Sequence, residues 1–89
     1  MRTYFERICL IASILDTLKI PYSTNQAYEG WQIRFPWCKG DICCHDGTVG
    51  AKTGLVETYE FPWDNGDVSA LTPEKAAILV ISLYSAISA

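Results

Sequence analysis

Three of the four cysteines and the only histidine of this 89-residue chain fall within one short segment, as Cys38, Cys43, Cys44 and His45. Thiolate sulfur and imidazole nitrogen are the usual ligands of zinc, which prefers four of them in a tetrahedron. A hairpin would bring Cys38 close to the segment 43–45. In a regular strand, Cys43 and His45 share one face, so with Cys38 they form the best trio of ligands. We therefore expect a structural zinc site in this segment.

The fourth ligand stays open on the sequence alone. Cys44 supplies it if the segment is a tight knuckle, and Asp64 or Asp46 supplies it if the segment is a strand. Two other interpretations compete with metal binding. Cys38 and Cys43 could form a disulfide, or all four side chains could be ordinary strand residues. The C-x4-C-C-H spacing is not one of the paired C-x2-C spacings of zinc fingers.

Catalysis by the same cluster is a weaker hypothesis. Three ligands with an open water position would resemble a catalytic zinc site, which also needs a carboxylate base nearby. Asp41, Asp46, Glu57 and Glu60 are close in sequence, but the chain has no H-E-x-x-H pattern. A small zinc-dependent hydrolase is therefore an alternative, and we expect a protein that is not an enzyme.

The composition indicates one globular domain, residues 1–89. Apolar residues make up 49% of the chain, and the formal net charge of −3 argues against direct nucleic-acid binding, which needs a basic surface. No run is long enough for a membrane span. Glu6 and Asp16 interrupt the N-terminal apolar run, which lacks a signal-peptide cleavage site. We expect a cytoplasmic protein. In this reducing compartment, cysteines more often bind metals or stay free than form disulfides.

The segment 53–74 contains five carboxylates and no basic residue. A solvated face that keeps the protein soluble is the ordinary interpretation. The sharper one is an acidic surface that binds a protein with a basic, nucleic-acid-binding surface. We expect its contact residues to be Glu57, Glu60, Asp64, Asp67 and Trp63. Tryptophan is frequent at interface hot spots, although Trp37 and Trp63 could equally lie buried under the helices.

Two segments have clear helical signals. The first is Thr3–Lys19, with apolar residues at helical spacing, a Thr3–Glu6 capping box and Pro21 beyond its end. Cys9 lies at the edge of its apolar stripe, so we expect a core thiol. The second begins at Thr72, followed by proline and glutamate. Its segment Ala76–Ile87 is apolar on more than one side, which predicts deep burial or an interface, such as a homodimer contact.

Alternating aromatic and polar residues predict three strands between the helices, at 31–37, 41–46 and 55–63. Loops are expected at 47–54 and 64–71, and Tyr22–Ala27 is expected to be turn-like, with a possible short extended piece. We predict an α+β fold, in which a three-stranded antiparallel meander is covered on one face by both helices.

The pattern F-P-W-x-x-G-D occurs twice, at 35–41 and at 61–67. Proline ends strand pairing, and glycine favours the turn that follows. We interpret the two copies as convergent turns at the end of two strands that run in the same direction. Cys38 and Asp64 then occupy equivalent positions at one end of the sheet.

The order helix, three strands, helix on a short acidic chain resembles small phage-borne inhibitors, in particular the anti-CRISPR proteins directed at type II Cas9 effectors. The most distinctive string is F-P-W-C-K-G-D-I-C-C-H, residues 35–45. The resemblance implies a metal-stabilised member that binds a Cas effector stoichiometrically and obstructs its guide or target nucleic acid. A net charge of only −3 favours surface blocking or an allosteric mode over mimicry of duplex DNA.

Overall fold

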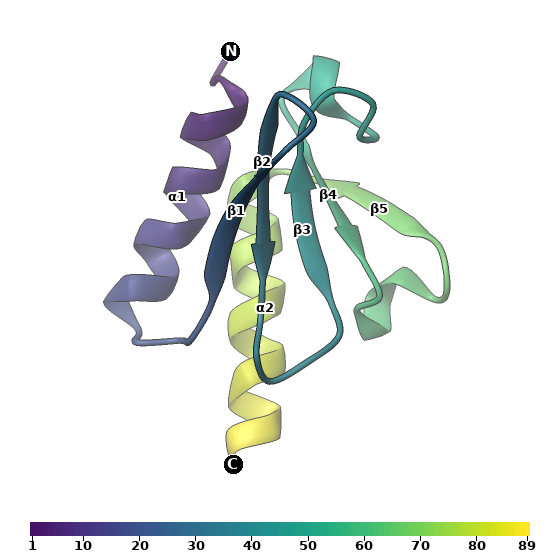
Figure 1. Cartoon of the computed structure of the whole chain (residues 1–89). Coiled ribbons are helices and arrows are strands. Elements are labelled where there is room, and N and C mark those ends of the chain that lie inside the picture. Colours follow the sequence, from purple (N-terminus) through teal and green to yellow (C-terminus); the bar gives the residue numbers. More distant parts are fainter.

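A computed structural model describes residues 1–89 as two helices and a five-stranded antiparallel sheet in the order β1-β2-β3-β4-β5. The elements are α1 (Tyr4–Thr17), β1 (Ser23–Ala27), β2 (Gly30–Arg34), β3 (Asp41–Cys44), the 3₁₀ turn η1 (Ala51–Thr53), β4 (Val56–Tyr59), the 3₁₀ turn η2 (Pro62–Asp64), β5 (Val68–Leu71) and α2 (Pro73–Ser88). Each strand pairs with the next one in sequence, as Figure 1 shows. The α+β class is confirmed, whereas the three-stranded meander is wrong.

The two additional strands are the edges of the sheet. β1 has the sequence S-T-N-Q-A and is exposed at four of its five positions, so it lacks the apolar alternation that marks a half-buried strand. β5 lies within the segment 64–71, which was expected to be a loop. The expected strands 31–37 and 55–63 end earlier, at Arg34 and Tyr59, because Pro36 and Pro62 follow.

Both helices cover the same face of the sheet. The strand register aligns Ile33, Ile42 and Thr58 across three strands, and all three are buried. These positions share one core with Ile11 of α1 and Val80 of α2. In Figure 1, α2 runs behind the sheet and α1 lies beside the β1–β2 hairpin. The opposite face of the sheet is left uncovered.

The helix starts match the sequence signals. Thr3 accepts a hydrogen bond from the Glu6 amide while the Glu6 carboxylate accepts one from the Thr3 amide, and Thr72 caps α2 through the Lys75 amide. α1 ends at Thr17, earlier than expected, and Lys19 adopts a left-handed conformation with φ of 57°. Neither helix has the length and apolar character needed to cross a bilayer.

Candidate functional site

β3 separates the cysteines that the sequence placed together. Cys44 points into the core and is completely buried, whereas its neighbour Cys43 lies on the uncovered face between Gln32 and Glu57 of the adjacent strands. Successive strand residues point to opposite faces, so the two thiols cannot bind one ion while β3 is a strand. The knuckle that would have made Cys44 the fourth ligand does not form.

Cys38 and His45 lie at opposite ends of β3. Cys38 belongs to the β2–β3 turn, and His45 follows the last residue of the strand. The four residue-to-residue steps from Asp41 to His45 span about 13 Å, far beyond the roughly 2 Å bonds around zinc. The Nδ1 atom of His45 lies 2.8 Å from the backbone oxygen of Asp46, and its ring packs at 5.2 Å from the ring of Tyr28.

The arrangement of these residues does not fit a tetrahedral zinc ion. No three His, Cys, Asp or Glu side chains are placed to hold a metal ion together. All four cysteines are free, so Cys38 and Cys43 do not form the alternative disulfide. The zinc prediction is left with composition as its only support.

Elemental analysis of purified protein, beside Cys43→Ser and His45→Ala, tests the zinc prediction directly. Zinc at one per chain, lost in both variants, would mean that β3 rearranges.

The thiols of this segment are held in their protonated form. Burial raises the pKa of Cys38 and of Cys44, although the guanidinium of Arg7 partly opposes the rise at Cys44. Burial, together with the nearby Asp41 carboxylate, raises the pKa of Cys43 to about 12. Because the thiolate is the reactive form of cysteine, these side chains are poorly suited to nucleophilic catalysis.

Asp64 is an internal capping residue and does not contribute to an acidic surface. It is only 4% exposed. Its Oδ1 accepts a hydrogen bond of 2.8 Å from the hydroxyl of Thr58, and its Oδ2 accepts one of 3.1 Å from the amide of Phe61. The predictions that Asp64 contacts a partner or supplies a metal ligand are therefore wrong, because both carboxylate oxygens close the η2 turn.

Trp63 is not an exposed anchor either. Its ring is partly buried and stacks on Phe61 at 4.4 Å between ring centroids. Its Nε1 donates a hydrogen bond of 3.0 Å to the hydroxyl of Thr58. Trp37 is used similarly, since its Nε1 donates to the backbone oxygen of Pro21 at 2.9 Å. Both indoles therefore hold turns in place. The sequence had left open whether these tryptophans are exposed anchors or buried side chains, and the structure shows both partly buried.

Four other carboxylates lie within two residues of Tyr59, or of the residues paired with it, at one end of the sheet. Tyr59 is 42% exposed and lies across from Asp41 of β3 and Val68 of β5. We call the set Asp41, Glu57, Glu60, Asp67 and Tyr59 the acidic patch. Glu57 shares the face of Tyr59, and Glu60 and Asp67 are exposed in the β4–β5 connection. Two exposed basic residues border the patch: Arg34 pairs with Asp41, and Lys39 lines a surface hollow together with Arg34, Asp41 and Glu60.

Asp41 is a half-buried carboxylate of the acidic patch. It accepts a hydrogen bond of 3.1 Å from the Gln32 amide, and its other oxygen lies 3.5 Å from the Cys43 sulfur. Burial raises the pKa of Asp41, while these hydrogen bonds and Arg34 partly oppose the rise. The patch holds carboxylates and one phenol, which suits binding of cationic groups.

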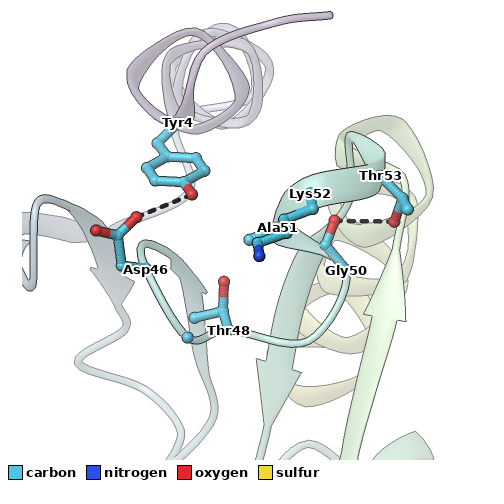
Figure 2. A pocket seen from close by; sticks show the side chains of 8 residues that line it. Tyr4, Asp46, Thr48, Gly50, Ala51, Lys52 and Thr53 are labelled. Carbon is cyan, nitrogen blue, oxygen red and sulfur yellow. Dashed lines mark hydrogen bonds between the residues drawn. The ribbon is translucent and has the colours of Figure 1, made fainter.

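A polar hollow lies at the other end of the molecule, between α1 and the loop that follows β3 (Figure 2). The hydroxyl of Tyr4 donates a hydrogen bond of 3.0 Å to Asp46, which raises the pKa of Tyr4. Asp46 and Lys52 lie on opposite sides of the hollow, with Thr48 between them, as Figure 2 shows. The walls carry one charge of each sign and no nucleophile paired with a base.

Arg7 lies beneath this hollow and is the main feature that the sequence did not indicate. It is 2% exposed, and its Nη1 donates to the backbone oxygens of Ala51 at 2.7 Å and Leu55 at 3.1 Å. Its guanidinium also packs against the ring of Tyr4 at 5.3 Å. The signal was its spacing, because Arg7 lies one helical turn before the buried Ile11. Arg7 thus ties α1 to the wall of the hollow.

No family model matches the chain, and the searches of curated proteins and of solved structures also find no match.

Proposed function

We propose that the chain is a non-enzymatic binding protein whose acidic patch contacts a basic, nucleic-acid-binding surface on another protein. The observation that carries the proposal is the position of the patch. The exposed Tyr59 pairs with Asp41, and the other three carboxylates lie within two residues of Tyr59 or next to its partner Val68, on or beside a sheet face that no helix covers. The raised pKa values of the Cys38 and Cys43 thiols, and the contact of the His45 ring with a backbone oxygen, support a binding role and not a catalytic one.

Electrostatic complementarity gives such a surface its choice of partner. Carboxylates opposite lysine and arginine residues speed association and disfavour acidic partners. A tyrosine at the centre supplies apolar contact area together with a hydrogen-bonding hydroxyl. Tyr59 occupies this central position, and the sequence did not single it out.

The resemblance to anti-CRISPR proteins makes Cas9 the specific partner that we propose. A patch of four carboxylates bordered by Arg34 is too small to imitate a DNA duplex, which carries one phosphate charge per about 1.7 Å of its axis. We infer that the protein blocks a basic surface of the effector, or shifts its conformation, and thereby obstructs the loading of guide or target.

A cleavage assay with type II Cas9 and increasing amounts of the protein tests this partner. We expect cleavage to fall and to level off near one chain per effector. Full cleavage at stoichiometric excess, whether the protein is added before or after the guide RNA, would remove Cas9 as the partner.

A triple variant tests the surface independently of the partner's name. Glu57→Gln, Glu60→Gln and Asp67→Asn together remove three charges with little change in shape, and glutamine at 57 can still accept the bond from the Val49 amide. We expect inhibition to weaken at least tenfold, and parental inhibition to weaken with added salt. The control is Glu29→Gln in the β1–β2 turn, at the opposite end of the sheet. Equal weakening by both would contradict the assignment.

A broader test covers the case in which Cas9 is not the partner. Protein captured from a bacterial lysate is compared between the parent, the triple variant and the Glu29→Gln control. We expect a basic protein that is captured by the parent and the control and is lost with the triple variant. Capture that does not depend on the three carboxylates would rule out the acidic patch as the binding surface.

A further inference from the structure

α2 presents an uncharged face to solvent. After Lys75 the chain contains no charged side chain through Ala89. Ala76, Ala77 and Val80 are buried against the core. At about 100° per residue, the opposite side of the helix carries the residues that we call the outward face, namely Ile78, Leu79, Ser82, Ser85 and Ala86. Ile78 is 57% exposed, and only Leu79 of this set is half-buried.

A helix face in contact with water alone normally carries charged side chains. Beyond Lys75 in the first turn, this side of α2 has none, whereas α1 carries Glu6 and Asp16 on its exposed side. No other element of the chain covers it, because the sheet and α1 pack against the buried side of α2.

We propose that the outward face of α2 binds the same face of a second copy of the chain, with the two helices antiparallel and the two-fold axis beside Ser82. The sizes of the side chains along the outward face support a second copy of the chain as the partner. Rotation about Ser82 places position 78 opposite position 86 of the other copy, and position 79 opposite 85. Ile78 then meets Ala86, and Leu79 meets Ser85. A large side chain faces a small one at each contact, which is the self-complementarity that a two-fold interface requires.

The charges at the ends of the helix agree with this arrangement. In the antiparallel pair, Lys75 of one copy approaches the last turn of the other helix, where the helix dipole favours a positive charge. The acidic patch lies on the other side of the sheet, so the pairing leaves it accessible in both copies. This inference does not depend on the proposed function.

The available area sets the expected strength of the dimer. A helix of 16 residues is about 24 Å long and about 10 Å wide, so half of its cylinder offers roughly 400 Å². A standard protein interface buries about 800 Å² on each partner. We therefore expect a weak dimer that forms with rising concentration, with a dissociation constant in the micromolar range or above.

Sedimentation velocity over a series from about 10 µM to about 1 mM measures this association. We expect the mass to rise from that of one chain, 9.9 kDa, toward twice that value. A single species with the mass of one chain over the whole series would overturn the proposal.

Ser82→Arg tests which face is used. The substitution places two like charges together at the two-fold axis, and we expect the dissociation constant to rise at least tenfold. Ser13→Arg is the matched control, because Ser13 is also an exposed serine within a helix, on α1. Unchanged thermal melting of both variants shows that the fold is intact. A dimer that tolerates Ser82→Arg, or is lost equally in the control, would contradict the proposed face.

Two further variants test the register. Ile78→Lys and Ala86→Glu should each weaken self-association, because each places a charge opposite an uncharged side chain. Mixed together, they should form a heterodimer in which the introduced lysine of one copy faces the introduced glutamate of the other. Recovery of dimer in the mixture, compared with each variant alone, is expected. No recovery would overturn the antiparallel pairing about Ser82.

Discussion

The segments 35–41 and 61–67 share the pattern F-P-W-x-x-G-D and lie at the same end of the sheet, but different contacts hold their turns. Phe35 and Phe61 are both buried, and their rings meet edge to face at 5.9 Å. β2 and β4 run in the same direction, so the expected placement of both turns at one end is confirmed. The shared pattern thus determines where a strand stops and which aromatic ring enters the core.

The fourth position of the pattern produces the difference. In the second copy, Asp64 accepts hydrogen bonds from Phe61 and Thr58, so the 3₁₀ turn is closed by its own residues and the strand just before it. In the first copy, Cys38 has no comparable pair of bonds, and Trp37 instead reaches Pro21 and packs against Tyr84 of α2 at 4.9 Å. The second turn is therefore self-contained, whereas the first depends on distant parts of the fold.

Replacement of the fourth residue of the pattern, Cys38 or Asp64, should give the largest difference in stability between the two turns. We expect Asp64→Ala to lower the free energy of unfolding by about 2–4 kcal/mol, because it leaves the buried Phe61 amide and Thr58 hydroxyl without their acceptor. Cys38→Ala should cost less than about 1 kcal/mol, since it removes one half-buried thiol. Urea unfolding measures both. Equal losses would show that the two turns are stabilised in the same way.

The glycines should give the next largest difference. A Cβ at Gly40 would lie 2.4 Å from the ring of Phe61, so we expect Gly40→Ala to cost about 1–3 kcal/mol by overpacking. Gly66 has no neighbour within 4 Å but has φ of 82°, so Gly66→Ala should cost about 1 kcal/mol through backbone strain. A larger loss at Gly66 than at Gly40 in the same unfolding experiment would contradict the close packing of the first copy on Phe61.

A double-mutant cycle with Tyr84→Leu tests how far each tryptophan acts from its own turn. Trp37→Phe and Trp63→Phe should each cost about 1 kcal/mol, the typical worth of one hydrogen bond. We expect a coupling energy of about 0.5–1.5 kcal/mol between Trp37 and Tyr84, whose rings touch, and about zero between Trp63 and Tyr84. Similar coupling for both tryptophans would rule out the distinction between a self-contained and a dependent turn.

Asp41, the last residue of the first copy, should make the stability depend slightly on pH. Burial raises the pKa of Asp41 above its ordinary value of 3.8, so the folded protein holds this proton more tightly than the unfolded chain does. Its contribution to stability is complete below pH of about 4 and is lost as pH rises through the raised value. Asp41→Asn should therefore be more stable than the parent at neutral pH, by less than about 1 kcal/mol because the carboxylate is partly solvated.

Unfolding of the parent and Asp41→Asn at pH 4 and pH 7 measures this difference, with Asp67→Asn as the variant at the matching position of the second copy. The stability advantage of Asp41→Asn should grow from pH 4 to pH 7. An advantage that shrinks over this range would contradict the raised pKa.

Local sequence signals predicted the starts of the helices better than the edges of the sheet. Thr3 and Thr72 are recognisable as N-caps because their partners lie three residues away in the chain. β1 was indicated only as a possible short extended piece within a turn-like segment, since an edge strand with solvent on both faces needs no apolar alternation. The acidic stretch was visible as composition, but a count of carboxylates could not distinguish the buried Asp64 from the exposed Glu60.

The amino-acid sequence by itself determined the class of fold, the two caps, the two strand-ending turns and the uncharged length of α2, because each depends on residues close together in the chain. Only the tertiary structure decided that the cysteine and histidine side chains lie apart, that Arg7 and Asp64 are buried, and that Tyr59 is central in the acidic patch. These depend on which face of a strand or helix a residue occupies once the sheet register is fixed. A shift of one residue in register exchanges the two faces, so proximity in sequence does not determine proximity of side chains.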